Sequence, residues 1–173
     1  MFKRLLISLA LGALPLGAAH AVPITMQFTA SGFGVSNSNA APTDPVTGTI
    51  VWEAASANAT IDSLSSINLT LNGHVYTLGE VGYHSFGSTL DVIGGTLSGA
   101  NGVSNMANDF WIVWNPMTLT PGEFTYASAT LPGIWISQNF TSFSITSAAV
   151  PEPATLGLLA LGLLGIGMKR RRN

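Results

Sequence analysis

Acidic side chains and two histidines are the groups in the middle of this chain that could do acid–base chemistry. Between residues 22 and 149 the acids are Asp44, Glu53, Asp62, Glu80, Asp91, Asp109 and Glu123, and the histidines are His74 and His84. Two carboxylates that face each other across a cleft would suit glycoside hydrolysis, but nothing in the sequence selects a pair. Scattered acids on a domain without basic residues also serve solubility alone. A polysaccharide hydrolase is therefore one candidate function.

Nucleophilic catalysis finds less support in the sequence. There is no Gly-x-Ser-x-Gly elbow, and the suggestive run Tyr83-His84-Ser85 would place neighbouring side chains on opposite faces of a strand. The chain contains no cysteine, which excludes disulfides and a zinc site built on thiolates. We therefore predict no catalytic residues and expect that the protein is not an enzyme.

Two sets of side chains have the chemistry to hold a metal ion. The first combines the two histidines with Glu80 or Asp91. The second is the loop at residues 101–109, where oxygens of Asn105, Asn108 and Asp109 are of the kind that calcium prefers. Neither set has the spacing of a known metal-binding motif, so we predict no metal and no cofactor.

Aromatic side chains could stack on sugar rings. The candidates for glycan contact are Trp111, Trp114 and Trp135, with Tyr76, Tyr83 and Tyr126 as further exposed-ring candidates. A Trp in a small β domain is more often part of the core. Because Trp111 and Trp114 are three residues apart, they fall on opposite faces of a strand, and one of them is expected to be exposed.

Every basic residue lies in a terminal segment of the chain. The six are Lys3, Arg4, Lys169, Arg170, Arg171 and Arg172, so the stretch between residues 22 and 149 has neither Lys nor Arg. Nucleic-acid binding depends on Lys and Arg that neutralise phosphates. The composition therefore argues against nucleic acid and against anionic ligands held by cation pairing.

The elements that must position these side chains are predicted to be short β-strands. Alternation of apolar and polar residues predicts strands at 24–29, 47–52 and 140–146, and residues 110–114 form an apolar run typical of a buried strand. Asn72-Gly73, between alternating segments at 67–71 and 74–78, predicts a hairpin with a type I′ turn. Further strands are expected at 88–93, 123–129 and 134–137. We predict an all-β fold, a single antiparallel β-sandwich or jelly-roll-like ectodomain at residues 22–149.

The first 21 residues are typical of a secretory signal peptide. Lys3 and Arg4 precede an apolar segment at 5–18, and small residues Ala19 and Ala21 suit the −3 and −1 positions of a cleavage site. We therefore predict export, with cleavage between Ala21 and Val22.

The last 24 residues combine three features in a fixed order. Pro151, Glu152 and Pro153 form a stiff, extended joint. An uncharged segment at 154–168 follows, and then a basic cluster of Lys169, Arg170, Arg171 and Arg172. An apolar helix followed by cations is typical of a membrane anchor. At about 1.5 Å per residue, this helix would be somewhat shorter than the roughly 30 Å of bilayer hydrocarbon, which suits a transient anchor.

This tail resembles the PEP-CTERM sorting signal of Gram-negative bacteria that make exopolysaccharide. The resemblance rests on Pro151, Glu152 and Pro153, the Leu/Gly-rich segment at 156–167 and the cluster Arg170–Arg172. It implies recognition by a membrane-embedded exosortase, a cysteine-dependent enzyme that cuts near the motif. Residues 150–173 would then be a sorting signal that is held in the inner membrane until cleavage.

These observations lead to an expected function with two alternatives. We expect an exported, non-enzymatic protein of the cell surface or extracellular matrix, sorted through an exosortase and associated with exopolysaccharide or biofilm. A carbohydrate-binding module for neutral glycans is the first alternative, and a hydrolase with paired carboxylates is the second. The resemblance concerns where the protein goes, whereas the alternatives concern what its middle domain does.

Overall fold

The computed structural model describes residues 21–95 and 100–148. They belong to one compact unit, Ala21–Ala148. Most of the predicted signal peptide and the whole sorting tail, including the apolar segment at 154–168, lie outside the described residues. Among the residues that are described, no helix is both long enough and apolar enough to cross a membrane.

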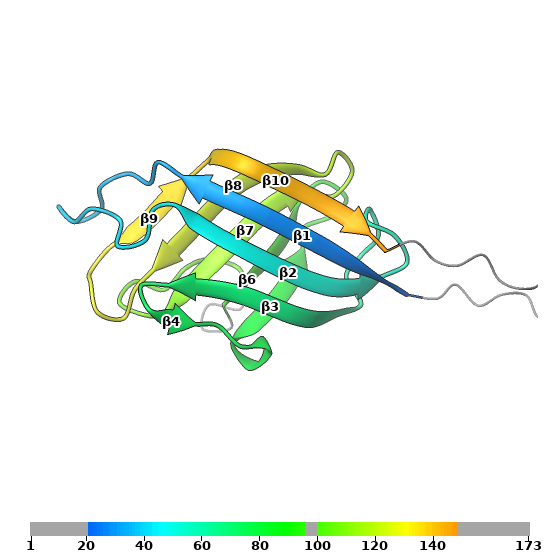
Figure 1. Cartoon of the computed structure of the whole chain (residues 1–173), viewed down its shortest axis with the longest axis horizontal. Helices are drawn as coiled ribbons and strands as arrows, with labels where there is room; N and C mark the ends of the chain where they lie inside the picture. Colours follow the sequence, from blue (N-terminus) through cyan, green and yellow to red (C-terminus); the bar gives the residue numbers. More distant parts are fainter. Residues whose placement is uncertain (1–20, 96–99, 149–173) are drawn as a thin grey trace, which may run out of the picture. The chain divides into compact units, whose positions relative to one another are not determined.

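The unit consists of two antiparallel five-stranded sheets, so the all-β prediction is confirmed. The first sheet has the order β10-β1-β2-β3-β4 and the second has the order β5-β6-β7-β8-β9. Figure 1 shows them as two layers. The strands of the first sheet are β1 (Val22–Ser31), β2 (Val46–Ala54), β3 (Ser63–Leu71), β4 (His74–Val75) and β10 (Asn139–Ser147). Those of the second are β5 (Val81–Ser85), β6 (Asp91–Gly95), β7 (Asp109–Asn115), β8 (Thr120–Ala127) and β9 (Ile134–Ser137).

Strict alternation of burial in β1 and β2 places one face of the first sheet in the core. Ile24, Met26 and Phe28 are at most 1% exposed, whereas the residues between them face outward or are only half-buried. A half-buried strand requires this period of two. Phe28 pairs with Gly48 of β2, and a Cβ at Gly48 would lie 2.5 Å from the Phe28 ring. Glycine at this position therefore leaves room for the ring.

The inner faces of the two sheets share one hydrophobic core. Phe124 of β8 lies at the centre of an aromatic cluster, with ring centroids 5.3 Å from Phe28, 5.9 Å from Phe110 and 6.1 Å from Phe33. At another point Trp52 of β2 packs against Trp114 of β7, with centroids 5.6 Å apart. The Phe28–Phe124 and Trp52–Trp114 contacts each join the two sheets, so burial of large rings holds the sheets together.

The predicted hairpin at Asn72-Gly73 is confirmed. Asn72 and Gly73 have φ values of 47° and 79°, the two positive values that a type I′ turn requires. The returning strand β4 is shorter than expected, because the chain leaves the first sheet after Val75. A 3₁₀ helix, η1 (Leu78–Glu80), then leads into β5. The predicted continuation at residues 80–83 therefore belongs to the second sheet.

The strand order corrects the jelly-roll part of the prediction. Strands β5 to β9 follow one another as a meander within one sheet, and β1 to β4 do the same in the other. A jelly roll would instead be built from two Greek keys. Only β10 departs from sequence order, because it returns to pair with β1.

Gly94 and Gly95 were expected to follow a strand and terminate it, but they are the last two residues of β6. The predicted strand at 88–93 is shifted, because β6 spans Asp91–Gly95. Gly94 pairs with Trp111, and a Cβ on Gly94 would lie 2.5 Å from the carbonyl oxygen of Phe110. The close approach of β6 and β7 thus explains why glycine occurs inside this strand.

The loop between β1 and β2 is fastened to the second sheet by hydrogen bonds. The Tyr126 hydroxyl donates to the Thr43 carbonyl oxygen at 2.7 Å and accepts from the Thr43 N–H at 2.9 Å. The Trp135 Nε1–H donates to the Asn39 carbonyl oxygen at 3.1 Å. Burial raises the pKa of Tyr126 to about 12, so the hydroxyl keeps its proton and remains a donor.

The two ends of the unit lie side by side. Ile24 near the start of β1 pairs with Ser147 at the end of β10, and the Ala148 N–H donates to the Pro23 carbonyl oxygen at 3.0 Å. Figure 1 shows the blue β1 and the orange β10 as neighbouring antiparallel strands. The chain therefore enters and leaves the domain at the same end of the first sheet.

Candidate functional site

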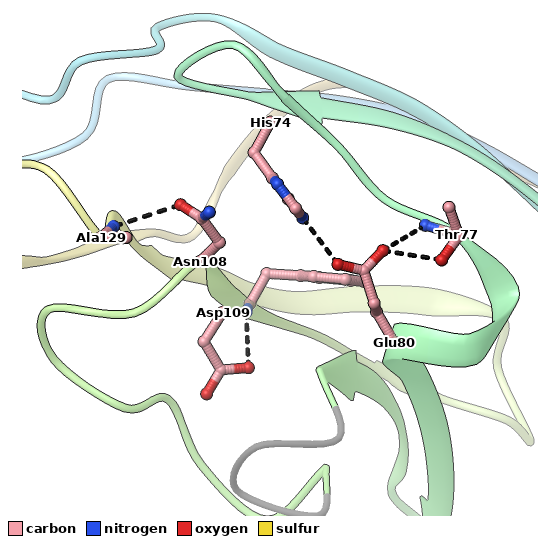
Figure 2. Close-up of polar contacts among 7 residues, drawn as sticks. His74, Thr77, Glu80, Asn108, Asp109 and Ala129 are labelled. Atoms are coloured by element: carbon pink, nitrogen blue, oxygen red, sulfur yellow. Dashed lines mark hydrogen bonds and ion pairs between the residues drawn. The ribbon is translucent and has the colours of Figure 1, made fainter.

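His74 and Glu80, two members of the first candidate metal-binding set, are in contact. His74 Nε2 lies 3.0 Å from Glu80 Oε1. Glu80 Oε2 accepts from the Thr77 N–H at 2.8 Å and from the Thr77 hydroxyl at 2.7 Å, as Figure 2 shows. The hydrogen bonds from Thr77, with a smaller contribution from His74, lower the pKa of Glu80. The carboxylate caps η1, a structural role that accounts for its contacts.

The remaining members of that set lie elsewhere. The ring of His84 packs against Phe86, with centroids 4.3 Å apart. Asp91 pairs with Ser85 across β5 and β6. Within the part of the chain that the structure describes, no three His, Asp or Glu side chains come close enough to hold a metal ion.

The second candidate set uses its oxygens to hold the 101–109 loop in place. Asn105 Oδ1 accepts from the Gly133 N–H at 2.9 Å, and Asn108 Oδ1 accepts from the Ala129 N–H at 3.1 Å. The carboxylate of Asp109, which is fully buried, accepts from the Ser104 N–H at 2.8 Å and from the Phe110 N–H at 3.0 Å. Figure 2 shows Asn108 directed toward Ala129. The Gly133 and Phe110 N–H groups belong to buried residues, so these two bonds satisfy donors that would otherwise lack partners.

A pocket beside β5 and β6 contains Asp91, the second acid that is buried in this domain. The pocket has a volume of about 520 Å³, and its lining includes Asp91 and Ser85 together with Asn58 of the β2–β3 loop. Asp91 is 4% exposed. Burial raises the pKa of the Asp91 carboxyl, and a hydrogen bond with Ser85 offsets part of this effect. A single buried carboxyl does not form the facing pair that glycoside hydrolysis uses.

Replacing Asp91 with Asn should stabilise the protein at neutral pH. Because the pKa of Asp91 is higher in the folded than in the unfolded state, ionisation of this carboxyl opposes folding. The contribution of Asp91 to the free energy of unfolding is therefore most favourable in acid, and it becomes less favourable as the pH rises through the folded-state pKa. Asp91→Asn removes this penalty and keeps an oxygen that can accept from Ser85. We expect a higher Tm than wild type at pH 7 and a smaller difference at pH 3. The exposed acid Asp62, changed to Asn, is the control, and equal Tm shifts in both variants would contradict the assignment.

Two of the three tryptophans predicted to contact glycan are in the core. Trp114 is 1% exposed and Trp135 is fully buried. Tyr76 and Tyr126 are buried as well. These four rings are therefore unavailable to a sugar, and the prediction was wrong for them because the sequence did not reveal which face of each strand is inside. Tyr83 remains exposed, at the β5 edge of the second sheet.

Trp111 is the tryptophan that faces outward, and it lies in a groove. The groove has a volume of about 530 Å³. Its apolar part consists of Phe86, Leu90, Val92, Trp111 and Val113. Its polar side chains are Asn101, Glu123 and Gln138. We call these eight residues the outer groove; it is the feature of the described domain best suited to ligand binding.

The sequence signal for this groove was the apolar run at 110–114. Residues on both faces of β7 are apolar, with Phe110, Ile112 and Trp114 in the core between the sheets and Val113 in a second small cluster with Val92. A strand with one solvated face would alternate with polar residues. Phe86, Asn101 and Gln138 carried no comparable signal, because they come from loops whose folding the sequence did not predict. Leu90 was predicted within a strand at 88–93, but it lies just before β6.

Comparison with known protein families identifies the tail of the chain. Residues 149–172 match the family described as the PEP-CTERM protein-sorting motif. Comparisons with curated proteins and with solved structures found no match. The match places this chain in the class of exported proteins that carry a C-terminal sorting signal.

The signal itself is the PEP-CTERM motif, so the predicted resemblance is confirmed. The matched range contains Pro151, Glu152 and Pro153 as well as the basic residues from Lys169 to Arg172. The motif implies a secreted protein that an exosortase sorts. The side chains that carry this function lie outside the described residues.

Proposed function

We propose that this protein is a non-enzymatic component of the cell surface or extracellular matrix, released from an inner-membrane anchor by exosortase processing. The observation that carries the proposal is the motif match at 149–172. The match begins directly after Ala148, the last residue of the compact unit. Cleavage at Pro151, Glu152 and Pro153 would therefore leave all ten strands in the released product.

The N-terminal boundary supports the same route. The predicted cleavage between Ala21 and Val22 falls where β1 begins, and Val22 is 8% exposed and pairs with Ala54. Removal of a signal peptide there would cost no strand pairing. The exported product would run from Val22 to the processing site, with the fold as its main part.

The chemistry of the domain supports a role in the matrix without catalysis. The described acids mostly serve structural hydrogen bonds, as Glu80 does for η1 and Asp109 for the loop before β7. The domain between residues 22 and 149 has no Lys or Arg. An association with exopolysaccharide would then depend on hydrogen bonds and ring stacking instead of ion pairs.

Fractionation of the native host tests this proposal. We expect the wild-type protein in the matrix and cell-surface fractions, and we expect it in the inner membrane when the exosortase is deleted, because the anchor then persists. The matched control is a periplasmic protein with a signal peptide and no sorting motif, whose distribution should not change. Recovery of the protein from the cytoplasm, or from the inner membrane in both strains, would contradict the proposal.

A further inference from the structure

We propose that the outer groove binds a neutral glycan, with Trp111 as the ring on which a sugar stacks. The inference deepens the proposed function, since it assigns to an exported matrix protein the surface that would hold a polysaccharide. It depends on that function only for the source of the glycan, and binding itself can be tested without export or processing.

The groove has the size and composition of a small-ligand site. Its volume of about 530 Å³ falls within the roughly 300–1,000 Å³ that is typical of such sites. Val92 and Val113 pair across β6 and β7 on the outer side of the second sheet, and Trp111 lies beside them. Phe86 and Leu90, which are 42% and 37% exposed, extend the apolar surface from the β5–β6 loop.

Hydrogen bonds hold the indole of Trp111 in a defined position. Its Nε1–H donates to Glu123 Oε1 at 2.9 Å, and the same oxygen accepts from the Thr125 hydroxyl at 3.1 Å. Trp111 also pairs with Gly94, and a Cβ on Gly94 would lie 3.1 Å from the Trp111 Cβ, so the backbone of β6 packs closely against this residue. A ring fixed in this way can stack on a ligand without losing much side-chain freedom, which favours binding.

The polar side chains of the groove match hydroxyl groups. Asn101 and Gln138 carry amides that both donate and accept hydrogen bonds, as sugar hydroxyls do. Glu123 Oε1 accepts two hydrogen bonds, and Oε2 of the same carboxylate is a further acceptor to which a ligand hydroxyl could donate. A pyranose likewise has an apolar ring face beside hydroxyl groups that donate and accept hydrogen bonds, so it complements this surface.

The charges of the groove residues favour a neutral ligand. The groove contains no Lys, Arg or His, so an anionic sugar would find no counter-charge and would meet the carboxylate of Glu123. A cationic ligand would gain from that carboxylate, but recognition of cations typically uses a cage of several aromatic rings. Only Trp111 and Phe86 are aromatic here, and the amides at the rim suit uncharged partners.

The four tryptophans of the chain provide a direct readout. We would record the indole N–H signals of the ¹⁵N-labelled full chain in lipid nanodiscs and titrate cellohexaose, mannohexaose, xylohexaose and maltohexaose. The signal of Trp111, assigned from Trp111→Phe, should shift with at least one of them. The signals of the core residues Trp52, Trp114 and Trp135 should stay in place and so exclude a general change in folding.

Substitutions distinguish stacking on Trp111 from binding elsewhere. Trp111→Ala should raise the Kd for the bound hexasaccharide on the order of tenfold or more, since loss of a stacked ring is comparable to the roughly 1.4 kcal/mol of a tenfold change. Trp111→Phe should retain part of the affinity. The matched control is Tyr83→Ala, which removes an exposed aromatic ring outside the groove and should leave Kd unchanged.

Four results would overturn the proposal. In the first, the Trp111 signal does not shift with any neutral hexasaccharide, and in the second it shifts equally with an oligogalacturonate. In the third, the affinity is unchanged in Trp111→Ala. In the last, the signal shifts with protein concentration alone. The last would mean that a second copy of the chain occupies the groove. Because the nanodisc sample requires no processing, failure here would leave the sorting proposal intact, and failure of sorting would leave the binding result intact.

Discussion

Phe124→Ala is expected to destabilise the domain by about 3–5 kcal/mol, the cost typical of removing a buried Phe side chain. Phe124 is fully buried and contacts rings from both sheets, including Phe28 of β1 and Phe110 of β7. Its loss would leave a cavity that the surrounding strands can fill only in part. Since small domains are stable by about 5–15 kcal/mol, much of the total would be lost.

Urea denaturation followed by tryptophan fluorescence measures this effect. Phe86→Ala is the matched control, because it removes the same ring from a position that is 42% exposed. We expect it to cost under about 1 kcal/mol, as is usual for surface substitutions. Equal losses in the two variants would mean that Phe124 does not join the sheets in the way described.

Replacing Pro151, Glu152 and Pro153 with Ala is expected to abolish processing while leaving membrane insertion intact. The motif match includes these residues, whereas insertion depends on the apolar segment at 154–168 and the cations that follow it. The precursor should therefore accumulate in the inner membrane at full length after signal-peptide removal. Immunoblots of membrane and outer fractions would follow the two forms.

A second variant separates recognition from topology. Changing Arg170, Arg171 and Arg172 to Gln removes three of the four positive charges that favour a cytoplasmic tail, so we expect both insertion and processing to weaken. Pro132→Ala, in an exposed loop of the domain, is the control for general effects of proline replacement and should be processed normally. Normal-length product in the medium from both tail variants would show that the sorting assignment is wrong.

Local sequence patterns predicted much of the first sheet and one strand of the second. Alternation located β1 and β2 to within a few residues, and Asn72-Gly73 predicted its turn because few other residues adopt two positive φ values. The strand Ile134–Ser137 was predicted with the observed bounds. In each case the information is contained in neighbouring residues.

Long-range information was missing where predictions failed. Residues 74–83 read as one continuing meander, but β4 ends at Val75 and β5 belongs to the other sheet. The burial of Trp135 was ambiguous because Ile134 and Ile136 on either side are apolar too, so both faces of β9 suit a core. The outer groove combines strand residues with loop residues such as Phe86 and Gln138, whose proximity depends on the complete fold.

Intact-mass analysis of the protein recovered from the outer fractions of its native host tests directly whether an exosortase releases it. We expect a product that begins at Val22 and ends near Pro151, Glu152 and Pro153, which would establish export, processing and release together. A product that still carries the residues up to Asn173 would instead mean a protein that keeps its tail. That result would contradict exosortase-dependent release and remove the main support for a role in the matrix.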